Sequence, residues 1–316
     1  MGSYLVTGGA GFIGAAVAQR LLAAGHEVVV VDNLTTGFRE NVPAGAVFVE
    51  GNCHDESLYQ RLPRCDYAAI YHLAGQSSGE ISFENPVYDM QTNTQSTLLL
   101  LKYALQSGCK RLLYASTMSV YGEQPDAPVT ETASTRPQSF YGVGKLASEH
   151  YLRIYRQYGI ESACLRLFNV YGPGQNMENL RQGMASIYLA HALKNRHIHV
   201  KGSAERFRDF IYIDDVVDAF LVLEKAALGT VPVYNICTGA KTTVADLVGR
   251  IVALLPFEVS VQYEGSTPGD MFGITGDCAK IVREISWTAR VPLDEGLRRM
   301  VAWALAAALV NQKEKA

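Results

Sequence analysis

A glycine-rich stretch near the N-terminus restricts the possible folds of this chain more than any other feature. The sequence VTGGAGFIG places Gly8, Gly11 and Gly14 three residues apart, after an apolar run typical of a strand and at the start of a helical pattern. In such a loop the first glycine permits a tight turn, the second lets a pyrophosphate approach the backbone, and the third lets the helix pack on the strand. The helix N-terminus at Phe12 and Ile13 adds free N–H groups and partial positive charge. The spacing therefore predicts a dinucleotide-binding loop.

An acidic residue stands where the second strand of such a unit ends. Asp32 closes the β-branched run HEVVVVD, at the expected distance of about 20 residues from the loop. A carboxylate in this place can accept hydrogen bonds from both hydroxyls of an adenosine ribose and would repel a 2′-phosphate. We therefore expect NAD rather than NADP, and we interpret the nearby Arg39 as a surface charge.

Strand-like and helix-like segments alternate through the first half of the chain. Apolar runs typical of buried strands occur at 3–8, 26–32, 46–51, 67–74, 110–116 and 161–172, and helical patterns occur at 12–25, 87–107 and 140–159. This alternation predicts an α/β fold with a parallel sheet covered by helices on both faces. After Pro173 the elements become shorter. We therefore expect a dinucleotide-binding domain over 1–173 and a smaller α/β lobe over 174–316 for the substrate, with part of the chain able to return to the sheet.

The composition argues against several classes of protein. The 316 residues carry a net charge of −3 and a pI near 6.2, which gives no electrostatic basis for binding nucleic acid or an anionic membrane. The six cysteines have no C-x-x-C spacing, so we expect no disulfide framework or thiolate zinc site, and a reducing, cytoplasmic location. We expect no signal peptide at the N-terminus, and the longest apolar run, 302–310, is too short to span a bilayer.

A tyrosine and a lysine share one face of the helix expected at 140–159. Tyr141 and Lys145 are four residues apart in SFYGVGKLASE, a spacing that puts two side chains on the same side of a helix. The pKa of a free tyrosine, about 10, is too high for a base at neutral pH, and a nearby ammonium lowers it by stabilising the phenolate. The same ammonium can hold the nicotinamide ribose. This spacing alone occurs on many helices by chance, and the dinucleotide loop upstream makes a catalytic pair the better interpretation.

These segments together resemble the extended short-chain dehydrogenase/reductase family, and within it the NAD-dependent nucleotide-sugar epimerases and dehydratases. The resemblance covers nearly the whole chain, and its other motifs are VVVVDNLTTG, YHLAG, VYG, LRLFNVYGPG and RFRDFIYIDDVV. It implies a Rossmann domain, a doubly wound parallel sheet that holds NAD, and a C-terminal lobe that holds a nucleoside diphosphate sugar, with a UDP-sugar as the expected form.

The resemblance also implies roles for individual residues. On the cofactor side the matching positions are Asp32 and Asn33 near adenosine, Leu73, Ala74 and Gly75 along the cofactor, and Asn93 close to it. On the substrate side, Thr117 matches the catalytic hydroxyl, with Ser116 as the less favoured choice. Asn169 and Arg208 match groups that hold the substrate diphosphate, and Asp270 matches an aspartate near it.

The two residues before VYG distinguish among the reactions of the family. Members that resemble 4,6-dehydratases carry Asp-Glu there to protonate the 6-hydroxyl and remove the C5 proton, and a resemblance to sugar-acid decarboxylases would favour a glutamate. Here they are Met118 and Ser119, and neither side chain is an acid or base at neutral pH. Tyr141, Lys145, Thr117 and NAD suffice for removing a hydride from C4 and returning it to the other face of a 4-keto sugar.

We therefore expect an NAD-dependent nucleotide-sugar 4-epimerase. The alternative within the family is a dehydratase or a 4-keto reductase. The alternative outside it is a non-catalytic NAD-binding protein, which we would expect to have lost Tyr141 or Lys145, although both are present.

Three departures from the family pattern concern the substrate and adenine sites. Thr267 stands where an arginine often precedes Asp270, so Arg181, Arg206 or another basic residue would have to replace that charge. The segment after YHLAG lacks the lysine of resembling galactose epimerases, and Asn52 replaces an aspartate that commonly lies near adenine. We expect a substrate other than plain UDP-galactose, such as a hexuronate or an N-acetylated sugar for a surface polysaccharide.

The remaining candidates have simpler interpretations. His197 and His199 alternate as on a strand, but with no third ligand we predict no metal site. Asp214 and Asp215 open a helix, and we expect them to cap it. The helices at 87–107 and 141–158 carry apolar stripes, and because resembling enzymes bury that surface in a four-helix interface, we expect a homodimer.

Overall fold

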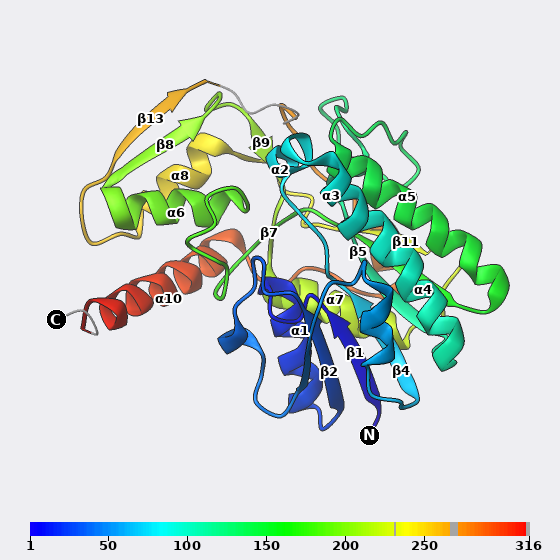
Figure 1. The fold of residues 1–316 in the computed structure, drawn as a ribbon. Helices are drawn as coiled ribbons and strands as arrows, with labels where there is room; N and C mark the ends of the chain where they lie inside the picture. The colour runs from blue at the N-terminus through cyan, green and yellow to red at the C-terminus, as the bar shows by residue number, and fades with distance from the viewer. Residues whose placement is uncertain (231, 266–270, 314–316) are drawn as a thin grey trace.

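A seven-stranded sheet, parallel throughout, lies at the centre of the molecule (Figure 1). The computed structural model describes residues 1–230, 232–265 and 271–313. The strand order is β11-β6-β5-β4-β1-β2-β3. The strands are β1 (Ser3–Thr7), β2 (Glu27–Asp32), β3 (Val47–Glu50), β4 (Tyr67–His72), β5 (Arg111–Thr117), β6 (Glu161–Leu167) and β11 (Val233–Ile236). The predicted Rossmann-like α/β fold is confirmed.

Helices cover both faces of this sheet, which explains why its strands are apolar almost without interruption. In β1, Tyr4 and Val6 point into one core and Leu5 into the other. The first core includes side chains of α1 (Phe12–Ala23) and α7 (Ile213–Lys225), and the second includes those of α4 (Ser96–Ser107) and α5 (Phe140–Tyr155). A strand buried on both faces has no solvent side and needs no polar alternation.

Strand β1 has β2 on one side and β4 on the other, and the strand order reverses between β1 and β4. At such a switch point the loops leaving the carboxyl ends of the strands diverge, and the crevice between them is where open α/β sheets bind ligands.

A smaller lobe packs beside the carboxyl ends of the strands (Figure 1). It contains α6 (Met184–Asn195), α8 (Val244–Ala253) and α10 (Leu293–Lys313), with short strand pairs formed by β8 (His197–Lys201) and β13 (Ser260–Glu264), and by β9 (Phe207–Arg208) and β12 (Thr242–Thr243). The chain does not stay in this lobe after residue 173, because α7 packs on α1 and β11 pairs with β6. The short helices α2 (Gly79–Glu84) and α9 (Ala279–Ile285) lie outside the sheet, as do the 3₁₀ turns η1 (Arg39–Asn41), η2 (Glu56–Gln60) and η5 (Arg156–Tyr158).

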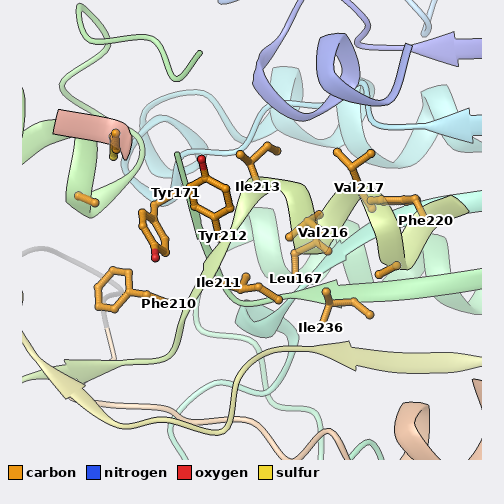
Figure 2. Packing of buried hydrophobic residues seen from close by; sticks show 14 of the residues in the cluster. Leu167, Tyr171, Phe210, Ile211, Tyr212, Ile213, Val216, Val217, Phe220 and Ile236 are labelled. Atoms are coloured by element: carbon orange, nitrogen blue, oxygen red, sulfur yellow. The ribbon is translucent and has the colours of Figure 1, made fainter. Parts of the chain in front are cut away.

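The junction between sheet and lobe differs from the single strand expected at 161–172. The sheet strand β6 ends at Leu167, and a separate strand, β7 (Asn169–Tyr171), pairs in parallel with β10 (Phe210–Tyr212). The rings of Tyr171, Phe210 and Tyr212 pack edge to face beside Leu167 and Ile236 (Figure 2). This aromatic packing redirects the chain, so Asn169 leaves the sheet at the edge of the crevice.

The long helix expected at 87–107 is interrupted. It consists of α3 (Pro86–Met90), a π-helical segment η3 (Gln91–Gln95) and α4. Such π segments often occur at functional sites, because they change the direction of side chains within a helix. Asn93 lies in this segment and is buried.

The start of α7 differs from the expectation for Asp214 and Asp215. Asp215 does not cap α7, which has no side-chain cap; its carboxylate accepts hydrogen bonds from the backbone N–H groups of Arg290 (2.9 Å) and Val291 (3.0 Å). The capping prediction was wrong because a distant loop supplies better-placed donors.

Among the residues described, no helix combines the length and apolar character needed to cross a membrane.

Candidate active site

A cavity of about 400 Å³ opens at the switch point. Its walls come from the carboxyl ends of the sheet strands, from the start of α5, and from the segments 76–78 and 175–183. Most of the predicted site residues line it: Gly8, Gly11, Phe12, Ile13, Asp32, Asn33, Leu73, Ala74, Gly75, Ser116, Thr117, Tyr141, Lys145 and Asn169. The fold thus brings together residues that are more than a hundred positions apart in the chain.

The glycine loop leaves its backbone open to the cavity. Gly8 has a φ of +72°, and a Cβ there would lie 2.7 Å from the Ala74 nitrogen, so only glycine fits. A Cβ at Gly14 would clash with the Gly8 carbonyl oxygen. Helix α1 begins after Gly11 with no side-chain cap and no acidic residue in its first turn. Its first N–H groups are therefore available to an anion.

Asp32 is held in place by the backbone on both sides. Its Oδ2 accepts a hydrogen bond from the Ala10 N–H (3.0 Å) and its Oδ1 from the Leu34 N–H (2.9 Å). Two of the roughly four lone-pair positions of the carboxylate are used in this way, so it can accept further hydrogen bonds. Beside it, the side chain of the cavity residue Asn33 donates a hydrogen bond to the Asn52 side chain (2.7 Å), so Asn52 helps to orient Asn33.

Tyr141 and Lys145 lie at the opposite end, in the first turns of α5. The Lys145 ammonium donates to the Ala115 carbonyl (3.0 Å) and lies 5.9 Å from the centre of the Tyr141 ring. Burial lowers the pKa of Lys145 to about 8. Burial also raises the pKa of Tyr141 to about 12, although a hydrogen bond with Thr117 acts in the other direction. The lowered tyrosine pKa expected from the motif is therefore absent from the protein alone, because loss of hydration is the largest effect on this pKa.

The two hydroxyls at the end of β5 have different partners. The Ser116 hydroxyl donates to Glu149, a buried carboxylate that forms an ion pair with Arg166 (2.7 Å). The Thr117 hydroxyl accepts a hydrogen bond from the Ser119 N–H (3.1 Å) and lies near enough to Tyr141 to lower the pKa of that tyrosine. Thr117, rather than Ser116, thus has its hydroxyl beside the tyrosine. Nothing in the sequence pattern pointed to the Glu149–Arg166 pair.

Met118 and Ser119 begin a single 3₁₀ turn, η4 (Met118–Val120), and both line the cavity. The cavity wall therefore carries a thioether and a hydroxyl at the two positions where an acid pair was considered.

On the lobe side the cavity is lined by side-chain amides. The segment 175–183 contributes Gln175, Asn176, Asn179 and Gln182, and β7 contributes Asn169. Two buried amide oxygens, Asn169 Oδ1 and Gln175 Oε1, have no hydrogen-bond partner. Buried polar atoms are nearly always satisfied, so these two point to a ligand that donates hydrogen bonds. The amide-rich stretch QNMENLRQ, which was not singled out from the sequence, was the signal for this wall.

Two predicted site residues in the described part of the chain, Asn93 and Arg208, are not among those that line the cavity. Asn93 is buried behind Gly75, and its side chain donates to the Gln76 carbonyl (2.8 Å) and to Asp89 (3.2 Å). Arg208 is buried, and its guanidinium donates to the carbonyls of Met271 (2.7 Å) and Phe272 (3.2 Å). Asp270 and Thr267 lie outside the described residues.

The alternative sources of positive charge have other partners. Arg181 forms an exposed ion pair with Glu84 (2.6 Å), and Arg206 is buried, with its guanidinium on the Lys201 carbonyl. His197 and His199, on β8, contact Ser260 and Glu264. Within the described ranges, no three His, Cys, Asp or Glu side chains come together as a metal ion would require.

The comparison with known families agrees with this geometry. The model of the "NAD dependent epimerase/dehydratase family" matches residues 4–237. The chain belongs to this family. The predicted family and its cofactor, NAD, are confirmed.

Solved members of the NAD-dependent epimerase/dehydratase family share the whole fold. The UDP-glucose 4-epimerase of Thermotoga maritima, solved with UDP-glucose, has a TM-score of 0.92 and 35% identity, covering 97% of this chain and 99% of that one. The UDP-glucose 4-epimerase of Thermus thermophilus, solved with NAD, has a TM-score of 0.90 and 33% identity, covering 96% and 99%. A relative with a different activity, UDP-glucuronic acid decarboxylase 1 of Xenopus tropicalis, is 32% identical and covers 94% of this chain and 70% of that protein.

The residues present fit NAD on physical grounds. The uncapped N-terminus of α1 suits a pyrophosphate, and the anchored Asp32 carboxylate suits ribose hydroxyls. Lys145 supplies an ammonium at the far end of the same cavity. These residues would hold the two ends of a dinucleotide.

Proposed function

We propose that this protein interconverts C4 epimers of a nucleoside diphosphate sugar through a 4-keto intermediate. One observation carries this proposal: Tyr141, Thr117 and Lys145 line the same cavity, and no carboxyl group stands at positions 118 and 119. A tyrosine base and a hydroxyl can oxidise and reduce C4 with the help of NAD, whereas an elimination needs a further acid and base.

The chain's own residues supply the proton transfer and the orientation. Bound NAD supplies the hydride acceptor for C4 and later the hydride donor. The Tyr141 oxygen takes the proton of the 4-hydroxyl and afterwards returns it, and the Thr117 hydroxyl holds the same region of the sugar. Because burial raises the pKa of Tyr141 to about 12, the phenolate needs positive charge nearby. The Lys145 ammonium on the same helix face would provide it.

The neutral residues at 118 and 119 argue against the other reactions of the family. A 4,6-dehydratase must remove the C5 proton and expel the 6-hydroxyl, and neither Met118 nor Ser119 can do so. A decarboxylase relative has comparable sequence identity, so overall similarity alone does not exclude that activity. The cavity chemistry favours epimerisation over both.

We further propose that the sugar is neutral, either a hexose or an N-acetylated hexosamine, carried on UDP. The amide wall offers two unpartnered acceptor oxygens, Asn169 Oδ1 and Gln175 Oε1, which need donors such as hydroxyl or amide N–H groups. Among the described lining residues, the only lysine or arginine is Lys145. A hexuronate carboxylate would therefore find no lysine or arginine in this lining besides Lys145, so of the two sugars expected from the sequence we retain the N-acetylated one. The plain hexose that the sequence disfavoured returns as a candidate because relatives of this chain are named UDP-glucose 4-epimerase. UDP is supported by the UDP-glucose bound to the Thermotoga maritima enzyme.

A homodimer is the assembly that the surface supports. Helices α3 and α4 follow one another along the side of α5 (Figure 1), and the three helices expose Val87, Met90, Leu105, Val143 and Ile154. Apolar side chains gathered on adjacent helices are typical of a subunit interface.

The six cysteines are free thiols, which supports the expected reducing, cytoplasmic location.

The direct test of this activity is product analysis with defined sugars. The purified enzyme is incubated separately with UDP-glucose, UDP-N-acetylglucosamine and UDP-glucuronate, and the products are identified by NMR. We expect the C4 epimer of one of the neutral sugars, with unchanged mass. Loss of water or carbon dioxide would overturn the epimerase proposal, and turnover of UDP-glucuronate alone would overturn the neutral-sugar proposal.

A further inference from the structure

Helix α3 carries a buried carboxylate that the proposed reaction does not use. The Asp89 side chain belongs to a residue that is only 1% exposed. Its Oδ1 accepts hydrogen bonds from Gln76 Nε2 (2.7 Å) and Asn93 Nδ2 (3.2 Å). Its Oδ2 is buried and has no hydrogen-bond partner. A buried carboxylate with one oxygen unsatisfied destabilises a fold, so its presence calls for a functional reason.

This carboxylate lies next to the catalytic helix. Helix α3 packs against α5, and Asp89 Oδ2 lies 3.5 Å from the position that a Cβ at Gly144 would occupy. Gly144 directly precedes Lys145. On the other side, Asn93 Oδ1 and the Lys145 ammonium both face Gly75, with the ammonium 3.3 Å from the Cβ position there. Asn93 thus links Asp89 to the space that Lys145 occupies.

The other groups around Lys145 carry no free negative charge. From β4, His72 is buried between the hydroxyls of Thr7 and Thr97, and burial lowers its pKa to about 3, so it stays neutral. From β5, the Tyr114 ring lies 4.9 Å from the ammonium, and burial raises the pKa of this tyrosine. On α5 itself, Glu149 is paired with Arg166. Asp89 is therefore the carboxylate, among the described residues, whose charge acts on Lys145.

We propose that Asp89 is a positioning residue whose buried negative charge keeps Lys145 as an ammonium beside Tyr141. The inference rests on the proposed function, because it assigns Asp89 to the same tyrosine–lysine pair. The π-helical turn of η3 contributes by directing Asn93 between the two groups.

The balance of charges explains why such a residue is needed. Burial alone lowers the pKa of Lys145 to about 8, and the charge of Asp89 acts in the opposite direction. Without that charge, the lysine would lose its proton closer to neutral pH and could no longer stabilise a phenolate. The same charge also raises the pKa of Tyr141. Removing it therefore lowers the pKa of both groups.

The variant Asp89→Asn tests this proposal with little change in packing. Its carbonyl oxygen keeps both acceptor contacts of Oδ1, and its amide replaces an oxygen that has no partner. We expect both limbs of the pH profile of kcat/KM to move to lower pH, by about one pH unit. Asp89→Glu, which keeps the charge, should retain the profile of the unmodified enzyme. Asp89→Ser, which removes the charge by a different side chain, should give the same shift as Asp89→Asn.

The matched control is Asp126→Asn, which removes one carboxylate charge at an exposed ion pair with Lys241 (2.6 Å), away from the cavity. This control should leave the profile in place. A folded Asp89→Asn enzyme with an unshifted profile would overturn the proposal. So would a uniform loss of activity at every pH, because that result indicates a structural role.

A second measurement does not depend on turnover. The phenolate of Tyr141 is followed by ultraviolet difference titration of the NAD-bound enzyme, with Tyr141→Phe as the subtracted reference. We expect the Tyr141 phenolate to appear at lower pH in Asp89→Asn. An unchanged titration would overturn the role of Asp89 even if the protein is an epimerase. A shifted titration with no epimer formed from any sugar would overturn the proposed function and leave the role of Asp89 standing.

Discussion

The cofactor side and the substrate side of the cavity are built in different ways. On the cofactor side, the loop at 8–14 and Asp32 come from one βαβ unit, and backbone hydrogen bonds fix the carboxylate. On the substrate side, the wall comes from β7 and the segment 175–183, and it carries the unpartnered oxygens of Asn169 and Gln175. One side is preformed by its own backbone, and the other has polar groups left to be satisfied by the substrate.

Because the two sides of the cavity differ in this way, substitutions on each side should change different measured quantities. Substitutions on the cofactor side should change NAD content or cofactor preference, because the proposed reaction cycle regenerates NAD within the site. Residues on the substrate side should change KM while NAD remains bound. Tyr141 lies between the two sides and should change kcat alone.

The largest effect on activity is expected at Tyr141, which lies between the cofactor side and the substrate side. Tyr141→Phe removes only the ionisable oxygen, so kcat should fall by roughly 100- to 10,000-fold. Bound NAD, Tm and substrate affinity should stay close to those of the unmodified enzyme. Steady-state kinetics together with nucleotide analysis of the denatured protein test this. A near-native rate would show that another group acts as the base.

A smaller effect is expected on the cofactor side. Asp32→Asn removes the charge that accepts ribose hydroxyls and repels a 2′-phosphate, so NAD affinity should fall by roughly 10- to 100-fold and discrimination against NADP should weaken. The unmodified protein, once denatured, should release NAD(H). Mainly NADP(H) in that release would contradict the role given to Asp32.

On the substrate side, Asn169→Ala removes an oxygen that has no partner within the protein. We expect KM to rise by about 10-fold, the value of one hydrogen bond, with NAD content unchanged. The folded protein should lose no stability, since no hydrogen bond of this oxygen is broken. A fall in Tm with an unchanged KM would place Asn169 among the structural residues.

The smallest effect on binding is expected at Arg208. Because its guanidinium holds the carbonyls of Met271 and Phe272, Arg208→Lys should lower the free energy of unfolding by about 1–3 kcal/mol and change KM less. Thermal unfolding and KM are measured on the same samples. If KM rises while Tm is unchanged, Arg208 contacts the diphosphate directly, as the family resemblance implies.

The same contrast explains what could be predicted from the sequence. The loop at 8–14 and the strand ending at Asp32 are local, so spacing alone predicts their geometry. The strand β7 after Phe168 pairs with β10, and its Tyr171 packs on Phe210 and Tyr212, about forty residues further along the chain. The apolar run at 161–172 gave no sign of this break. The partner of Ser116 and the unpartnered Oδ2 of Asp89 likewise depend on side chains from other elements. The direction of the Tyr141 pKa was predicted wrongly because the motif shows the ammonium but not the depth of burial.

The transfer of hydrogen at C4 tests the central claim most directly. Substrate deuterated at C4 is converted in ordinary water, and unlabelled substrate is converted in heavy water. Epimerisation without an acid pair predicts that the C4 label stays at C4 and that heavy water places no deuterium on carbon, with the mass of the sugar otherwise unchanged. Deuterium at C5 or C6, or a product lighter by one water, would contradict the epimerase proposal. Either result would show that a residue other than Met118 and Ser119 acts as an acid or base on C5 and C6.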